Sequence, residues 1–236
     1  MIDLFFAPTP NGWKATIMLE ECELPYRLHL VNIAAGEQFS DAFLALSPNA
    51  KIPAIRDTSV QGDPVSVFET GTILQYLAEK TGKFLSADHA LRFQQLQWLY
   101  WQVANLGPMG GQVSHFVNYA TDGNDYSRSR YLNEYDRLLA VMDAELSRHR
   151  YLGSDEYSIA DMASFPWLLP LKHYGFDLAN YPSLKRWWDE LKQRPALRRG
   201  VDVGKEQVPS QPLDEEARSV LFNQTSKNMR TEKNGE

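Results

Sequence analysis

Residues 2–33 read IDLFFAPTPNGWKATIMLEECELPYRLHLVNI, and three patterns follow one another within this segment. It opens on a compact apolar run that is long enough for a buried strand. Apolar side chains then recur at the helical spacing i, i+3, i+4 and i+7, at Ala15, Met18, Leu19 and Cys22. Between Tyr26 and Ile33 apolar and polar residues alternate, as in a second strand. The order strand, helix, strand predicts a parallel pair joined by a right-handed crossover.

The following segment adds two strands and a helix. The apolar segments 52–56 and 65–68 predict strands, which a polar turn around Gly62 separates. Residues 70–79 carry apolar side chains at helical spacing and predict a helix. A strand that opens on Pro53 predicts a rigid turn of the kind in which cis proline occurs. The whole pattern, βαβ-ββα, predicts an α/β domain with a mixed four-stranded sheet.

Beyond residue 88 the periodicity is helical. Helices are predicted over 91–103, 126–148 and 182–192, and the Gly- and Pro-rich segment 106–111 must bend or interrupt the chain after the first of them. Ser158 and Asp161 have the spacing of a capping box, at the start of a buried helix. The sequence thus predicts an α/β domain over residues 1–80, a linker over 81–88, an all-α domain over 89–205 and a polar extension over 206–236.

The extension contains one further helical pattern. Its apolar side chains lie at i, i+4, i+7 and i+8, at Leu213, Ala217, Val220 and Leu221, behind three acidic residues that suit the first turn of a helix. We expect a short amphipathic helix that docks back on the body of the protein and covers the entrance of its site.

Composition excludes several classes of function. A net charge of −6 and a pI of 5.4 do not suit a protein that binds nucleic acid or an anionic membrane surface. The single cysteine excludes an internal disulfide and a cysteine-rich zinc site, and the five histidines lack metal-ligand spacing, so no metal is expected. No segment has the roughly 20 apolar residues of a membrane span, and Asp3 stands where a signal peptide would be basic. A cytoplasmic protein is expected.

Two loops carry polar groups that could either cap a helix or bind a ligand. In the segment 9–12, Thr9 and Asn11 supply a hydroxyl and an amide beside helix N-terminal N–H groups, an arrangement that stabilises an anion. Glu69 and Thr70 likewise place a carboxylate and a hydroxyl at the N-terminus of the helix over 70–79. Gln38 lies in an irregular connection, where a polar side chain usually faces solvent. From these residues alone, capping and binding both remain open.

The joint order of these motifs resembles the glutathione transferase superfamily, and within it the bacterial Nu-class enzymes related to the fungal nitrogen-regulatory glutathione-transferase-like protein. The residues that carry the resemblance are APTPNG at 7–12, SPNAKIPAI at 47–55, FETG at 68–71, QWLYWQ at 97–102, LGPM at 106–109 and YSIAD at 157–161. The resemblance extends from residue 1 to about 205. It implies the glutathione transferase fold, with a thioredoxin-like N-terminal domain followed by an all-helical domain, and a homodimer.

The resemblance also implies how the reacting end of glutathione is held. Thr9 and Asn11 would face its sulfur and act as the catalytic groups. The backbone of Ile52, before an expected cis Pro53, would pair with the cysteinyl main chain in the manner of an added strand. No acidic or imidazole base is present in this loop, so hydrogen bonds and the helix N-terminus would have to stabilise the thiolate.

The two ends of the tripeptide are assigned by the same resemblance. Glu69 would meet the γ-glutamyl ammonium, and Thr70 with its helix N-terminus would hold the adjacent carboxylate. Gln38 and Lys51 would reach the glycyl end. Arg130 matches an arginine that contacts glutathione, at a position that suits the second of two bound molecules.

Three functions remain in competition. The first is a glutathione-dependent disulfide-bond oxidoreductase acting on small disulfides or peroxides, in which glutathione supplies both reacting thiols because Cys22, on the apolar stripe, is expected to be buried. The second is conjugation of glutathione to small electrophiles. The third is a non-catalytic, glutathione-binding regulatory protein. His115, Phe116 and Tyr119 are candidates for the second-substrate pocket, with core packing as the alternative.

Overall fold

The structure, a computed structural model, describes residues 1–120, 123–207 and 213–229. Four strands, β1 (Ile2–Phe6), β2 (Tyr26–Leu30), β3 (Ala54–Asp57) and β4 (Val65–Phe68), form one sheet in the order β2-β1-β3-β4. The β1–β2 pair is parallel, with Leu4 opposite Leu28, and β3 is antiparallel to both β1 and β4. The predicted mixed sheet is confirmed.

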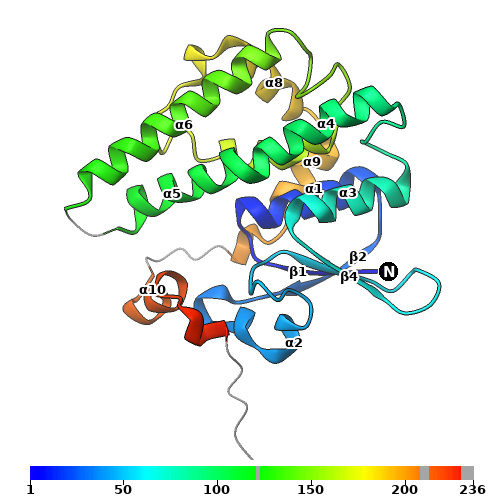
Figure 1. The fold of residues 1–236 in the computed structure, drawn as a ribbon, viewed down its shortest axis with the longest axis vertical. Helices are drawn as coiled ribbons and strands as arrows, with labels where there is room; N and C mark the ends of the chain where they lie inside the picture. The colour runs from blue at the N-terminus through cyan, green and yellow to red at the C-terminus, as the bar shows by residue number, and fades with distance from the viewer. Residues whose placement is uncertain (121–122, 208–212, 230–236) are drawn as a thin grey trace, which may run out of the picture.

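Two helices separate the sheet from the helical half of the protein. α1 (Pro10–Cys22) and α3 (Thr70–Thr81) cover one face of the sheet, and the short α2 (Asp41–Leu44) lies on its other side (Figure 1). Gly12 allows α1 to start close to β1, because a Cβ at this position would lie 2.1 Å from the carbonyl oxygen of Ala7 and 2.7 Å from the Phe6 ring. This close approach fixes the first turn of α1 against the end of β1.

Two strands differ in extent from the predicted ones, and each difference has a local cause. The strand predicted over 26–33 ends at Leu30, because Asn32 caps a 3-10 turn at Ile33–Ala35 through its side chain. The strand predicted over 52–56 begins at Ala54, because Pro53 has no N–H to donate to the ladder. The Ile52–Pro53 peptide bond is cis, as the sequence suggested.

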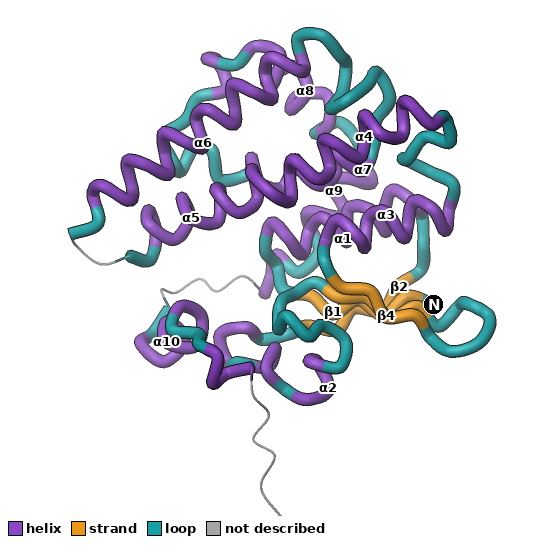
Figure 2. The backbone as a smooth tube through the Cα atoms, in the orientation of Figure 1, coloured by secondary structure: helices purple, strands orange, loops and turns teal. Residues whose placement is uncertain are grey.

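Helices form the rest of the fold (Figure 2). They are α4 (His89–Trp101), α5 (Gly107–Asn118), α6 (Asp125–Leu146), α7 (Ile159–Ser164), α8 (Pro182–Leu191) and α9 (Pro195–Asp202). The interruption predicted near residues 106–111 is a π-helical turn, Gln102–Leu106, that joins α4 to α5. Pro108 follows this turn at the second residue of α5, and because a proline has no N–H to donate to the preceding turn, it favours the interruption of the α-helical ladder there. The turn directs the Gln102 side chain into the interior.

The capping box at the start of α7 is confirmed. Ser158 and Asp161 form it, and the buried Asp161 carboxylate also accepts from the Leu152 N–H (3.0 Å) and the Trp187 indole (2.7 Å). α7 is fully buried and short, because the chain passes into a 3-10 turn at Phe165–Leu168, which contains a proline. Asp161 thereby ties a loop and two helices into one core.

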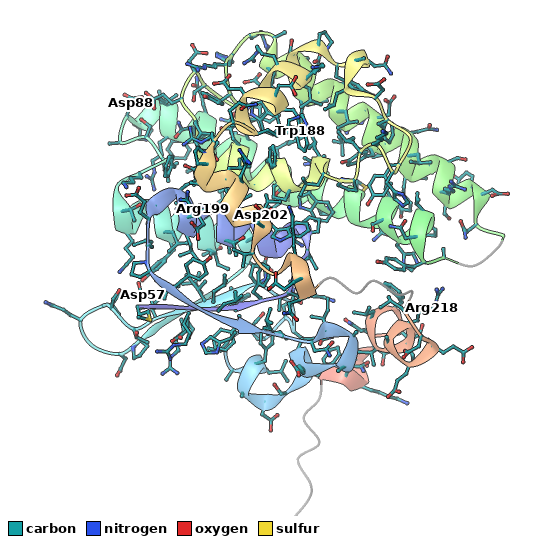
Figure 3. The ribbon with its side chains drawn as sticks, turned by 180° about the vertical axis from the view of Figure 1, so that it is seen from behind. Asp57, Asp88, Trp188, Arg199, Asp202 and Arg218 are labelled. Carbon is teal, nitrogen blue, oxygen red and sulfur yellow. The ribbon has the colours of Figure 1, made fainter. Side chains whose placement is uncertain are left out.

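The two halves share an interface along α1. α9 packs against this helix, and Figure 3 shows Arg199 and Asp202 on α9 beside it. Arg194 forms a two-pronged pair with the buried Glu21 carboxylate at 2.7 Å, and Arg199 pairs with Glu20 at 2.8 Å. The interface holds α1, and with it the loop that precedes α1, in a fixed position.

The C-terminal extension forms the expected helix, α10 (Glu215–Phe222), capped by Asp214. The Arg218 guanidinium donates to the carbonyl of Tyr119 at the end of α5. Lys51, in the loop before β3, donates to Gln224 just beyond α10 at 2.9 Å. The extension therefore docks on both halves of the body, as predicted.

Candidate functional site

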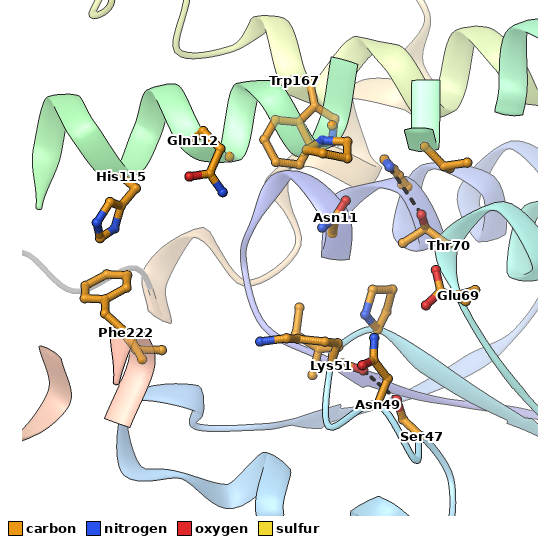
Figure 4. A pocket seen from close by; sticks show the side chains of 18 residues that line it. Asn11, Ser47, Asn49, Lys51, Glu69, Thr70, Gln112, His115, Trp167 and Phe222 are labelled. Atoms are coloured by element: carbon orange, nitrogen blue, oxygen red, sulfur yellow. Dashed lines mark hydrogen bonds between the residues drawn. The ribbon is translucent and has the colours of Figure 1, made fainter. Parts of the chain in front are cut away.

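A cavity of about 660 Å³ lies between the α/β half and the helical half, within the size range of ligand pockets. The first turns of α1 and α3, the loop before β3, α5 and the end of α10 supply its walls. Figure 4 shows Asn11, Glu69 and Thr70 toward one end, and the facing rings of His115 and Phe222 at the other.

The loop before β3 forms one wall through its backbone. The Ser47 hydroxyl donates to the carbonyl of Lys51 at 2.9 Å and holds the loop closed on itself. Ile52 and Pro53 line the cavity, one step before Ala54, the first paired residue of β3. Within the described residues neither the N–H nor the C=O of Ile52 forms a hydrogen bond. These groups can therefore pair with an extended peptide.

Glu69 occupies the N-cap position of α3, but its side chain forms no capping hydrogen bond. Its backbone has a φ of 67°, a left-handed conformation that costs about 1–3 kcal/mol for a residue with a side chain. The carboxylate lines the cavity beside Thr70 instead. A strained residue whose side chain does not cap the helix favours the binding interpretation of Glu69 over the capping one.

Asn11 lines the cavity from the first turn of α1, and its amide forms no hydrogen bond within the described residues. Thr9 is the N-cap of α1, and its hydroxyl accepts from the Gly12 N–H at 3.2 Å. Thr9 lies beside the cavity and does not form part of its wall. The N-terminal end of α1, which carries a positive partial charge, and the Asn11 amide therefore both face the cavity.

Lys14 lines this cavity, and sequence reasoning missed it. Its side chain is 1% exposed, and its ammonium donates to Gln102 Oε1 at 2.7 Å and to Thr70 Oγ1 at 3.2 Å. It lies 5.9 Å from the centre of the Trp167 ring. Burial lowers the pKa of Lys14 to about 7, although the nearby Glu69 carboxylate opposes the shift. One signal was available, since Lys14 stands four residues before Met18 and so borders the apolar stripe of α1.

Two predicted residues lie away from the cavity. Gln38 is buried, and its Nε2 donates to the carbonyl of Ile33 at 3.1 Å while its Oε1 has no partner among the described residues. Arg130, on α6, lines a separate surface cavity with Tyr126 and Glu134. The structure therefore brings six of the predicted residues together in the cavity: Asn11, Lys51, Ile52, Pro53, Glu69 and Thr70.

The far end of the cavity is aromatic. His115 from α5 lines it, and the Phe222 ring at the end of α10 lies 4.9 Å from the His115 ring. Phe116 and Tyr119, the other aromatic candidates, line an adjoining cavity between α5 and α10. Phe222 was not singled out from the sequence, because its contact with His115 spans nearly half of the chain.

The single thiol lies elsewhere. Cys22, the last residue of α1, is buried, and its sulfur lies 3.5 Å from the Thr81 hydroxyl. Burial raises the pKa of the Cys22 thiol and so disfavours the thiolate. Among the described residues no group of three His, Cys, Asp or Glu side chains could hold a metal ion, and none of the helices described is long and apolar enough to cross a membrane.

Several known proteins are similar to this chain in sequence and in fold. The chain is 50% identical to the disulfide-bond oxidoreductase YfcG of Escherichia coli (strain K12) over 198 residues, which cover 83% of this chain and 92% of that protein. A glutathione transferase from Pseudomonas putida, crystallised with one glutathione disulfide bound per subunit, matches with a TM-score of 0.80 at 42% identity, covering 86% of this chain and 91% of that one.

A glutathione transferase family member from Pseudomonas fluorescens pf-5, crystallised with two glutathione bound, matches with a TM-score of 0.79 at 41% identity, covering 85% of this chain and 92% of that one. Residues 9–80 match the glutathione S-transferase N-terminal domain, and residues 122–195 match the C-terminal domain of the same enzymes. The sequence matches, the thioredoxin-like sheet and the helical half together place this chain in the glutathione S-transferase family.

Proposed function

We propose that this protein is a glutathione-dependent disulfide-bond oxidoreductase in which thiols of glutathione, not of the protein, exchange with the substrate disulfide. One observation carries the proposal: the only cysteine, Cys22, is buried at the end of α1 remote from the cavity. Eleven helical steps separate it from Asn11, roughly 16.5 Å at 1.5 Å per residue. Both reacting sulfurs must therefore come from outside the chain.

The walls of the cavity suit the tripeptide. The backbone N–H and C=O of Ile52, which have no partner among the described residues, suit the cysteinyl residue, and the Glu69 carboxylate suits the γ-glutamyl ammonium. Thr70 and the N-terminus of α3 suit the neighbouring carboxylate. Lys51, on the opposite side of the cavity, suits the glycyl carboxylate when the Lys51 ammonium releases Gln224.

We propose that Asn11 and Thr9 stabilise the glutathione thiolate. The Asn11 amide and the positive end of α1 favour an anion, and the pKa of the bound thiol would fall for that reason. Thr9 can donate its hydroxyl proton to sulfur while its oxygen accepts from Gly12. No proton acceptor from the protein is needed if the thiol ionises to solvent.

The proposed exchange takes two glutathione molecules. The thiolate of the first attacks one sulfur of the substrate disulfide, forms a mixed disulfide and releases the other sulfur as a thiolate that takes up a proton. The second glutathione, as thiolate, attacks the glutathione sulfur of the mixed disulfide and releases the second substrate thiol. Glutathione disulfide is the oxidised product, and the substrate gains the two electrons. Similar proteins that bind one glutathione disulfide or two glutathione molecules per subunit support this stoichiometry.

A turnover assay separates this activity from its alternatives. With glutathione and hydroxyethyl disulfide, we expect turnover that clearly exceeds conjugation of glutathione to 1-chloro-2,4-dinitrobenzene. Faster conjugation would indicate a transferase of small electrophiles. A folded protein that binds glutathione but turns over neither substrate would be a binding or regulatory module, and the proposal would be wrong.

We also propose a cytoplasmic homodimer. Phe93 and Tyr100, both on α4, are exposed by more than half of their surface, and such aromatic side chains suit a protein interface. A lone, unpaired cysteine suits a reducing compartment. Light scattering at micromolar concentration should report twice the 27.0 kDa chain mass, and a 27.0 kDa species would contradict the dimer.

A further inference from the structure

Two hydrogen-bond donors behind Thr70, at or close to the wall of the cavity, lack acceptors within the described residues. Gln102 Nε2 and Trp167 Nε1 are buried and have no partner within the described residues. Both nitrogens lie next to Gly107, which lines the cavity. A Cβ built on Gly107 would lie 3.0 Å from Gln102 Nε2 and 3.6 Å from Trp167 Nε1. Buried donors of this kind normally find an acceptor, so a ligand oxygen would complete them.

Lys14 determines which way these groups point. A charged ammonium can only donate, so the Thr70 oxygen at 3.2 Å and the Gln102 Oε1 at 2.7 Å both act as acceptors toward it. The hydroxyl proton of Thr70 must then point away from Lys14, and Thr70 lines the cavity. The Gln102 amide is fixed in the same way, with its Nε2 turned away from the ammonium.

A neutral Lys14 would not impose this arrangement. An uncharged amine has a lone pair, so it can accept the Thr70 proton and turn that hydroxyl inward, away from the cavity. With a pKa of about 7 in the unliganded protein, Lys14 exists in both forms near neutral pH. Within the part of the chain that the structure describes, the Glu69 carboxylate is the one charged group that acts on Lys14, and its other close neighbours are Thr70, Gln102 and Trp167.

We propose that Lys14 is a positioning residue that turns the Thr70 donor toward the cavity and the Gln102 donor toward Gly107 in the cavity wall, and that it takes up a proton when the carboxylate of the γ-glutamyl end binds. The inference rests on the proposed binding of glutathione. A bound carboxylate adds negative charge near Lys14 and favours its ammonium, so binding and protonation stabilise each other. Affinity for the ligand should therefore fall as the pH rises above 7.

Calorimetry with S-methylglutathione measures this coupling, because that ligand has no thiol to ionise. Titrations at pH 7.5 in phosphate and in Tris, whose ionisation enthalpies differ, give the number of protons taken up. From a free pKa of about 7 we expect uptake of roughly 0.5 to 0.8 proton per site in the wild type. Lys14→Met should abolish the uptake and weaken binding by about 10-fold at pH 6.5, with a smaller difference at pH 8.5.

Two matched controls identify the group. Lys51→Met removes the exposed lysine of the same cavity, and His115→Gln removes its histidine; both variants should keep the proton uptake whatever they do to affinity. If Lys14→Met fails to fold, Gln102→Glu serves instead. A carboxylate beside Lys14 holds the ammonium charged before the ligand arrives, so uptake should fall to near zero.

The outcomes separate this inference from the proposed function. The positioning role is supported if Lys14→Met and Gln102→Glu lose the proton uptake while Lys51→Met and His115→Gln keep it. Binding of S-methylglutathione without proton uptake, or uptake that persists in Lys14→Met or Gln102→Glu, overturns the inference and leaves the proposed function standing. A wild-type protein that binds neither glutathione nor S-methylglutathione overturns both.

Discussion

Asn11 lies in the first turn of α1 and Cys22 is the last residue of the same helix, so the length of α1 separates the cavity from the only thiol of the chain. The helix is also fixed at that distance, because α9 and the ion pairs of Glu20 and Glu21 hold it against the helical half. This separation is the structural reason for assigning both reacting sulfurs to glutathione.

Asn11→Ala should lower the rate of glutathione-dependent disulfide reduction by roughly 10- to 1000-fold, as expected when a donor that stabilises an anion is lost. Thr9→Ala should lower the rate in the same direction. Steady-state kinetics with hydroxyethyl disulfide measures the effect, and circular dichroism verifies the fold. Asn180→Ala, an exposed and remote amide, is the control. An unchanged rate in Asn11→Ala would show that another group stabilises the thiolate.

Glu69→Ala should weaken glutathione binding by roughly 10- to 100-fold, because a charge-assisted contact with the γ-glutamyl ammonium contributes about 1.5–3 kcal/mol. The stability of the protein should change little, since the carboxylate caps no helix. Calorimetric titration and thermal melting measure the two effects separately, with the exposed Glu156→Ala as a reference. A variant that melts lower but binds glutathione normally would support the capping interpretation.

Truncation after Lys205 should lower the melting temperature and raise KM for the disulfide substrate by about 3- to 10-fold. The truncation removes Leu221 and Phe222, which close the aromatic end of the cavity, and releases Lys51 from Gln224. Truncation after Met229 keeps α10 and should behave as the full chain. Unchanged kinetics and melting after the shorter truncation would mean that α10 has no part in the site.

Asp161→Ala should lower the free energy of unfolding by about 3–5 kcal/mol, because the N–H groups of Leu152, Ser158 and Trp187 lose a buried acceptor. Asp161→Asn retains one acceptor oxygen and should cost less. Urea denaturation measures the differences, with exposed Asp63→Ala as the comparison. A loss below about 1 kcal/mol in Asp161→Ala would contradict the central role given to this carboxylate.

Much of the fold follows from local patterns. The apolar run at residues 2–6, the stripe on α1 and the Ser158–Asp161 pair each act within a few residues, so the strands, the helix and the capping box could be predicted. The cis bond before Pro53 and the helix in the extension have equally local signals.

The rest of the site depends on contacts between distant segments. A lysine on a helix normally faces solvent, and only the packing of α3, the π turn and Trp167 around Lys14 buries it. The docking of α10 was predicted, but its partner was not, because no local pattern shows that Phe222 meets His115 of α5. Gln38 turns inward for a different, local reason, since its amide donates to the carbonyl of Ile33 within the same irregular connection.

The most direct test of the account is the turnover of Cys22→Ala with glutathione and hydroxyethyl disulfide, measured beside the wild type at equal concentration of folded protein. Because Cys22 is buried and lies at the end of α1 away from the cavity, the variant should keep nearly the full kcat/KM. A variant that folds, binds glutathione and yet has lost its turnover would show that the protein thiol takes part, and would contradict an exchange carried out by glutathione alone.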